Sequence, residues 1–152
     1  MTARKNPFTS NFGLIQPFID FAHATKDGVD PTLGNLIEIR ASQINGCAGC
    51  LVMHTRAARS IGESEERIYL LNAWRESTLF SERERAALAW TEAVTTLQPG
   101  GVPDDVYETF AATFDAKEQA LITLLVGVIN VFNRMNVSYQ VRPPASPARN
   151  EA

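Results

Sequence analysis

The sequence predicts an all-α protein, a single-domain helical bundle of six or seven helices. Apolar residues recur at helical spacing along most of the chain, and several segments begin with an N-cap residue and end near glycine. No segment alternates apolar and polar side chains as a half-buried strand does, although residues 137–141 could be briefly extended. The 152 residues, 45% of them hydrophobic, are enough to form the core of one domain.

The chain divides into three parts by composition. We expect an N-terminal arm over residues 1–12, because Asn6 and Pro7 interrupt any early helix. The helical domain then covers residues 13–140. Residues 141–152 are rich in proline and polar residues, so we expect a flexible tail.

Cap residues, prolines and glycines set the expected helices. The helices are expected at residues 14–26, 31–43, 47–61, 64–74, 82–97, 104–114 and 116–132. Ser81 with Glu84, and Asp115 with Glu118, have the spacing of capping boxes. The segment Ala120–Phe132 is apolar nearly all round, which predicts a buried helix that other subunits also cover. By length we expect this helix not to cross a membrane.

The net charge and the composition of the N-terminus limit the expected binding partners and cellular location. The net charge is −3 and the isoelectric point is about 5.4, and no basic run occurs, so we expect neither nucleic-acid nor membrane binding. The N-terminus has no apolar signal-peptide core, which predicts a cytoplasmic location. Because the cytoplasm is reducing, the two cysteines are expected to form a working dithiol, not a structural disulfide.

Both cysteines and one histidine lie within eight residues, Cys47 to His54. In a helix, Cys47, Cys50 and His54 share one face, within an arc of about 60°. The imidazole is one turn from Cys50 and favours its thiolate, the form that attacks peroxides and disulfides. Cys47 lies near the helix start, where unpaired backbone N–H groups also favour a thiolate.

Two other interpretations of this motif compete with redox chemistry. In a zinc site, the cysteines and His54 would supply three ligands, but no second cysteine pair exists and His23 is remote in sequence. We expect His23 to be a structural or surface residue. The cysteines could also be buried structural residues, but Ala48 and Gly49 fill no core volume and leave room near the sulfurs. The motif thus predicts redox chemistry without a metal or cofactor.

Three stretches carry a family resemblance: RASQINGCAGC at residues 40–50 with His54, AWRE at 73–76 and ERAALAWTE at 84–92. Over about residues 30–139 the chain resembles the AhpD-like alkylhydroperoxidase family, within the carboxymuconolactone decarboxylase superfamily. The resemblance implies a helical subunit in trimers or hexamers, with thiol peroxidase or disulfide reductase activity. It implies that Cys50 reacts with a peroxide, that Cys47 resolves it, and that His54 and a glutamate relay the proton. A protein or small thiol would be the reductant.

The glutamate of the relay departs from the family pattern. The family places it twelve residues before the first cysteine, where this chain has Asn35, and Gly49 stands where well-known members have histidine. A polar stripe follows the expected helix at i, i+3, i+7 and i+10, comprising Asn35, Glu38, Ser42 and Asn45. The stripe faces either solvent or the active site. In the second case Glu38, one turn nearer the cysteines, replaces the family glutamate, and Glu92 is a second candidate.

The predicted function is therefore a thiol-dependent alkylhydroperoxide reductase in antioxidant defence, with Cys47, Cys50, His54 and Glu38 as site residues. One alternative is a decarboxylase or lactone-converting enzyme of the superfamily, which works by proton transfer and needs no CxxC. The other is a non-enzymatic redox-sensing module, in which the dithiol only switches conformation.

Overall fold

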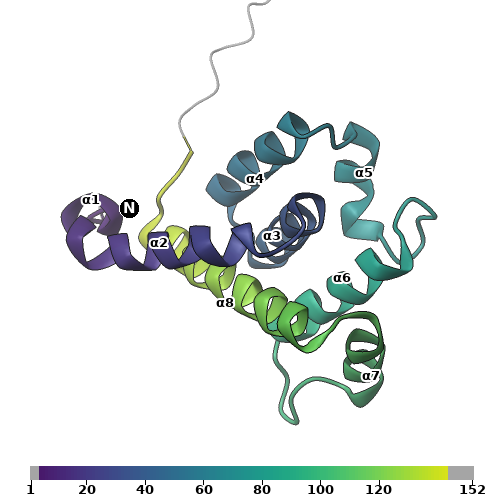
Figure 1. Ribbon diagram of the computed structural model, residues 1–152. Coiled ribbons are helices and arrows are strands. Elements are labelled where there is room, and N and C mark those ends of the chain that lie inside the picture. The colour runs from purple at the N-terminus through teal and green to yellow at the C-terminus, as the bar shows by residue number, and fades with distance from the viewer. Residues whose placement is uncertain (1–3, 144–152) are drawn as a thin grey trace, which may run out of the picture.

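The computed structural model describes residues 4–143, and this range contains eight α-helices and one 3₁₀ helix (Figure 1). The elements are α1 (Pro7–Ser10), α2 (Phe12–Asp27), α3 (Pro31–Asn45), α4 (Ala48–Ser60), α5 (Glu65–Leu70), η1 (Leu71–Ala73), α6 (Glu82–Thr95), α7 (Asp104–Thr113) and α8 (Ala116–Tyr139). The only β pairing among these residues is an isolated bridge between Gln98 and Gly101. The predicted all-α fold is confirmed, whereas the expected number of helices was too low.

Helix α3 occupies the middle of the bundle, with α2, α4, α6 and α8 packed around it (Figure 1). Its start is set by Asp30, whose carboxylate accepts a hydrogen bond from the Leu33 amide at 2.9 Å, and by Pro31 in its first turn. It ends at Gly46, whose φ of +65° lies in the left-handed region that favours glycine. These two signals fix the length of the central helix and the direction in which the chain turns into α4.

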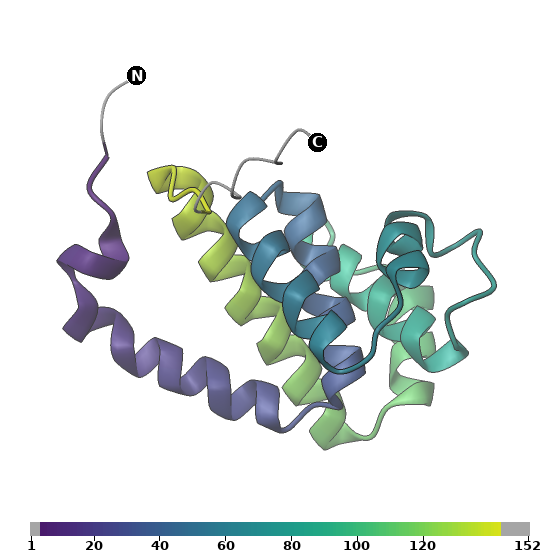
Figure 2. The ribbon, with the colours of Figure 1, turned by 90° about the horizontal axis from the view of Figure 1, so that it is seen from above.

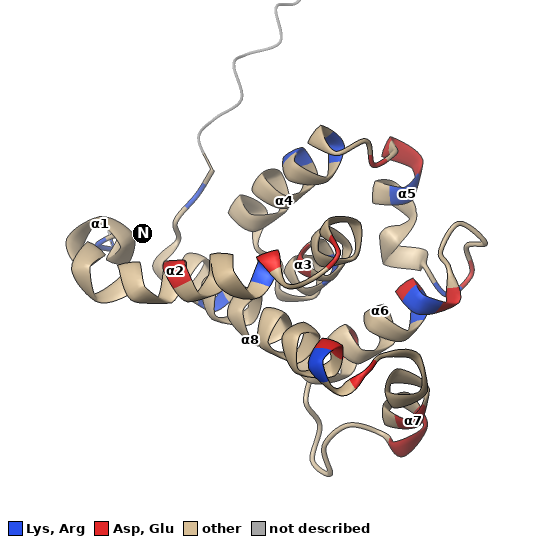
Figure 3. Cartoon of the chain, in the orientation of Figure 1, with Lys and Arg blue, Asp and Glu red and all other residues tan. Residues whose placement is uncertain are grey.

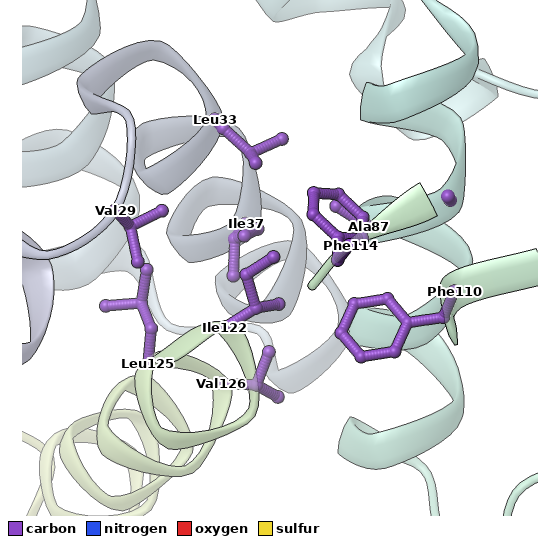
Figure 4. Packing of buried hydrophobic residues seen from close by; sticks show 10 residues of the cluster. Val29, Leu33, Ile37, Ala87, Phe110, Phe114, Ile122, Leu125 and Val126 are labelled. Carbon is purple, nitrogen blue, oxygen red and sulfur yellow. The ribbon is translucent and has the colours of Figure 1, made fainter. Parts of the chain in front are cut away.

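Apolar side chains on two sides of α3 form two core clusters. The first joins α3 to α6, α7 and α8 (Figure 4) and comprises Val29, Leu33, Ile37, Ala86, Ala87, Phe110, Phe114, Ile122, Leu125 and Val126. The second joins α3 to α4, α5, η1 and α6 and comprises Leu36, Ile39, Ala58, Ile68, Leu71, Trp74, Phe80 and Leu88. Each large side chain that is fully buried here contributes about 1.5–3 kcal/mol relative to exposure. The two clusters therefore hold α3 rigidly between its neighbours.

The N-terminal arm is more helical than expected. Asn6 was predicted to interrupt a helix, but its side chain accepts a hydrogen bond from the Phe8 amide at 2.9 Å and caps α1. Pro7 follows in the first turn, where its missing N–H costs nothing. Helix α2 then starts at Phe12, so Pro17 lies in its second turn and not in its first. Figure 2 shows α1 and α2 as an arm that stands off from the bundle beside α8.

Helix α8 begins after the predicted capping box at Asp115 but continues beyond Phe132, where the predicted apolar segment ends. It continues past Asn133 because this side chain is fully buried and hydrogen-bonded, to Ser42 Oγ at 3.0 Å and to Asn45 Nδ2 at 2.9 Å. Residues 137–139 are helical, so the extended segment expected there is wrong. The helix ends where Gln140 adopts a left-handed conformation, with φ of 56°.

The length argument against a membrane span is also wrong. Helix α8 has 24 residues with a window of mean hydropathy 1.5, so it is long and apolar enough to cross a membrane by these two measures. It nevertheless packs against α2, α3 and α6 inside the chain. One third of its apolar window is buried, while Leu124, Val131 and Val137 are exposed, and Figure 3 shows few charged positions beyond its first turn. Coverage of this exposed face by other subunits stays a prediction.

Candidate active site

The two cysteines lie where α3 turns into α4. Cys47 is the N-cap of α4, and its Sγ accepts a hydrogen bond from the Cys50 amide at 3.3 Å. Cys50 lies in the first turn of the helix, and the two residues form a disulfide with their Cα atoms 5.4 Å apart. Both are almost fully buried, with exposed fractions of 1% and 2%. A CxxC spacing at a helix N-terminus thus brings both sulfurs into bonding contact.

His54 lies one turn after Cys50 on α4 and is also buried. Its Nδ1 is 3.0 Å from Oε2 of Glu38 on α3. Since an ionised carboxylate only accepts hydrogen bonds, we assign the proton of a neutral imidazole to Nδ1, which leaves Nε2 as an acceptor. Nε2 is buried and has no hydrogen-bond partner among the described residues. A buried acceptor without a partner is available for a proton or a substrate.

Glu38 belongs to a network that the sequence did not reveal. Its Oε2 also accepts from the ammonium of Lys26 on α2 at 2.5 Å, and Lys26 donates to Oδ1 of Asn35 at 3.1 Å. Asn35, in the position of the family glutamate, therefore holds the lysine, and the histidine is held by Glu38 instead. The polar stripe on α3 does not face solvent. Asn35 and Glu38 are 4% and 5% exposed, and Ser42 is fully buried.

The charge of Glu38 is stabilised by its neighbours. Burial alone would raise the pKa of its carboxyl, but the hydrogen bond and charge of His54, together with the charge of Lys26, outweigh burial and hold the pKa below its ordinary value. Glu38 is therefore ionised at neutral pH. It can hold His54 in one orientation and stabilise a positive charge on the imidazole.

Asn136, near the end of α8, also contacts the dithiol. Its Nδ2 is 3.2 Å from Sγ of Cys50, in position to donate a hydrogen bond to the sulfur. A donor at this position stabilises a thiolate when the disulfide is reduced. Sequence analysis missed Asn136, which is 86 residues from Cys50, and Lys26, which is 12 residues from Glu38. No local sequence signal marks either residue, because only the packing of α2 and α8 brings them to the site.

A cavity of about 410 Å³ opens beside Cys50 and His54. Its walls come from the α1–α2 arm, α3, α4 and α8, with lining residues Phe8, Ile19, Ala22, His23, Lys26, Glu38, Cys50, Met53, His54, Ala57, Val128, Phe132 and Asn136. Most of these side chains are apolar. Asn136 contacts the Cys50 sulfur, and Lys26 and His54 contact Glu38. His23, expected to be structural or at the surface, is exposed on α2 and lines this cavity. The site combines a dithiol, a histidine–carboxylate pair and an apolar pocket.

The other two glutamates considered have different surroundings. Glu92 accepts hydrogen bonds from Arg40 and from the Trp74 indole, each at 2.8 Å, and does not line the cavity. Glu84 completes the predicted capping box with Ser81 and also pairs with Arg67. Among the described residues, no group of three or more His, Cys, Asp or Glu side chains could hold a metal ion.

The fold and the site together define an all-helical protein with a CxxC dithiol beside a histidine. The chain belongs to the carboxymuconolactone decarboxylase family, whose model matches residues 15–93. It is 38% identical over 116 residues to the uncharacterized protein YdfG of Bacillus subtilis, covering 76% of this chain and 79% of that protein. It is 30% identical over 131 residues to the uncharacterized protein YnjA of Escherichia coli, covering 86% of this chain and 71% of that protein.

Solved structures give the same fold. A protein of unknown function from Agrobacterium tumefaciens, described as a candidate antioxidant defence protein AhpD, matches with a TM-score of 0.87 and 36% identity, covering 95% of this chain and all of that chain. A variant of the debrominase Bmp8, in complex with 2,3,4-tribromopyrrole, matches with a TM-score of 0.78 and 18% identity. That match covers 88% of this chain and 72% of the debrominase. The AhpD-like resemblance is thereby confirmed.

Proposed function

We propose that this protein is a thiol-dependent peroxidase that reduces organic hydroperoxides in antioxidant defence. The single observation that carries the proposal is the shared cavity: Cys50 and His54 line the same largely apolar pocket, and His54 has one buried nitrogen without a partner among the described residues. An apolar pocket binds the organic part of a hydroperoxide, while the peroxide group lies near the sulfur and the imidazole. The similarity to a candidate AhpD antioxidant protein supports the same activity.

The reaction starts from the reduced dithiol. His54 Nε2 takes the proton of the Cys50 thiol, and the Cys50 thiolate attacks the distal oxygen of ROOH. The O–O bond breaks, and the alkoxide leaves as ROH with that proton from the imidazolium. Cys50 is now a sulfenic acid. The Cys47 thiolate attacks its sulfur and releases hydroxide, which takes up a proton to give water, and the Cys47–Cys50 disulfide forms. Two external thiols reduce this disulfide and are themselves oxidised.

The neighbours of the dithiol support each step. Glu38 holds Nδ1 of His54, so the unpartnered lone pair of Nε2 exchanges the proton with substrate. Asn136 stabilises the Cys50 thiolate before attack. Glu38 thus replaces the family glutamate whose position Asn35 occupies. We further propose a homo-oligomer in the cytoplasm, a trimer or hexamer, with a thiol protein or small thiol as reductant. The exposed apolar face of α8 supports the oligomer.

Steady-state peroxide consumption tests the proposal. With cumene hydroperoxide as substrate and dithiothreitol as reductant, the wild type is expected to turn over, Cys50→Ser to be inert, and Cys47→Ser to form a sulfenic acid at Cys50. Equal activity in Cys50→Ser and wild type would contradict the assigned nucleophile. A proton-transfer reaction on a lactone or carboxylate substrate that survives removal of both cysteines would instead favour the decarboxylase alternative.

A second candidate reaction is reductive dehalogenation. A dithiol with Cys50 in an apolar cavity of about 410 Å³ can also deliver two electrons to a halogenated ring. Cys50 would attack the halogen, the carbon would take a proton from His54, and Cys47 would displace halide to form the disulfide. The fold shared with the debrominase Bmp8 motivates the test. Bromide release from brominated pyrroles or phenols, faster than cumene hydroperoxide consumption, would favour this substrate class.

A further inference from the structure

A second cavity, of about 180 Å³, lies between the start of α4 and the end of α8. It is lined by Cys47 and Ala48 on one side and by Asn136, Val141 and Pro143 on the other. Cys47 lines this cavity and Cys50 does not, whereas Cys50 lines the larger cavity and Cys47 does not. Asn136 lines both. The two cysteines of one disulfide therefore line two different cavities.

We propose that the smaller cavity is the entrance for the reductant, and that the reductant's thiol attacks Cys47. The inference rests on the dithiol cycle proposed above. It adds which sulfur the reductant attacks and through which cavity the reductant reaches it. The cavity's volume of about 180 Å³ is below the roughly 300–1,000 Å³ of a drug-sized ligand site, so the cavity admits only the thiol end of a reductant. Substrate and reductant then enter at different places and do not compete for the larger cavity.

The exchange step favours attack at Cys47. A reductant thiolate RS⁻ forms a bond with Cys47 Sγ, the Cys47–Cys50 bond breaks, and Cys50 leaves as a thiolate. Each sulfur accepts one hydrogen bond from an N–H group, so hydrogen bonding alone does not decide which of the two is the better leaving group. The departing Cys50 also shares its cavity with His54, whose imidazole balances the thiolate charge when it is protonated at Nε2. A second thiol attacks the mixed disulfide, releasing RSSR and the Cys47 thiolate, which takes up a proton.

The two residues between the cysteines, Ala48 and Gly49, have too little side chain to cover the smaller cavity. Ala48 is exposed and lines the smaller cavity. At Gly49, an added Cβ would lie 3.7 Å from the carbonyl oxygen of Val141 and 4.0 Å from Cδ of Pro143, which line the same cavity. Gly49 is helical without a positive φ, so its backbone does not require glycine. The absence of a side chain here keeps space open beneath the segment that follows α8.

Mapping the mixed disulfide tests the proposal directly. The protein is oxidised with diamide, exposed briefly to glutathione, quenched in acid and analysed by peptide mass. We expect glutathione on Cys47, with Cys50 free. Glutathione mainly on Cys50 would overturn the inference. Because diamide supplies the disulfide, this result does not depend on peroxidase activity: a Cys47 adduct without peroxide turnover refutes only the proposed function, and peroxide turnover with a Cys50 adduct refutes only this inference.

Variants at the entrance provide a second test with its own readout. Ala48→Leu should slow the reduction of the disulfide by glutathione about tenfold more than it slows oxidation by cumene hydroperoxide, since it fills only the smaller cavity. Gly49→Leu should act in the same way if Ala48→Leu folds poorly. Gly13→Leu, at a helix glycine with no atom within 4 Å of an added Cβ, is the matched control. Equal slowing of both half-reactions in the two entrance variants would contradict separate entrances.

Discussion

The hydrogen bond from Asn136 to Cys50 predicts the reactivity of the thiol. Asn136→Leu removes the donor while keeping a similar volume. A hydrogen bond to a charged group contributes about 1.5–3 kcal/mol, so its loss should disfavour the thiolate and raise the pKa of the Cys50 thiol. At a pH below the thiol pKa of both proteins, the thiolate fraction of the variant should be about 10–100-fold lower than that of the parent. A more basic thiolate is a better nucleophile, which reduces the net loss in rate to about 3–10-fold.

The pH profile of alkylation provides the assay. In a Cys47→Ser background, the rate of Cys50 reaction with iodoacetamide is measured from about pH 5 to pH 10, with Asn136 present or replaced by leucine. The variant should be slower at neutral pH and should equal or exceed the parent above the thiol pKa. Asn72→Leu, at an exposed asparagine bonded to Arg40, serves as control. A profile with unchanged midpoint and plateau would refute the role of Asn136.

Three further predictions concern the buried charges and the core. Glu38→Gln should slow peroxide consumption by about tenfold or more, as expected for lost acid–base assistance, whereas Glu65→Gln on the exposed face of α5 should not. Because the pKa of Glu38 is lowered in the folded state, its ionised carboxylate stabilises the fold at pH values above 4.5, the ordinary pKa of a glutamate. This stabilisation is lost as the pH falls through the pKa of the folded state. Lys26→Met should therefore raise that pKa and move the acid limb of both stability and activity to higher pH. Leu36→Ala, at a fully buried site, should lower the free energy of unfolding by about 2–5 kcal/mol in urea titrations.

Each of these predictions has a result that contradicts it. Unchanged peroxide consumption in Glu38→Gln would make this carboxylate structural, and an unmoved acid limb in Lys26→Met would remove the lysine from the network. A urea midpoint for Leu36→Ala that matches the wild type would contradict the packing around α3. Far-ultraviolet circular dichroism distinguishes loss of function from loss of fold in every variant.

Local signals predicted much of the fold. Asp30, Pro31 and Gly46 set the bounds of α3 within about two residues, and the capping boxes at Ser81 and Asp115 mark where α6 and α8 begin. Such caps act over one helical turn, so a sequence pattern reveals them. The CxxC spacing likewise placed both sulfurs and His54 together. These features depend on neighbours in sequence and not on packing.

Features that depend on distant contacts were missed or misjudged. Helix α8 continues through Asn133 because Ser42 and Asn45 satisfy its buried amide, and nothing near position 133 in sequence shows this. Lys26 and Asn136 reach the site only through the packing of α2 and α8. The pattern of the polar stripe on α3 was compatible with solvent or with the active site. Its burial follows from neighbours on other helices, which periodicity alone does not identify.

The most direct test of the account is a single-turnover titration of the reduced protein. One equivalent of cumene hydroperoxide is added without reductant, and free thiols, cumyl alcohol and disulfide-linked peptides are measured. The account predicts loss of both thiols, one equivalent of alcohol and an intramolecular link between Cys47 and Cys50. Retention of both thiols after peroxide addition, or covalent dimers as the main product, would contradict a dithiol peroxidase.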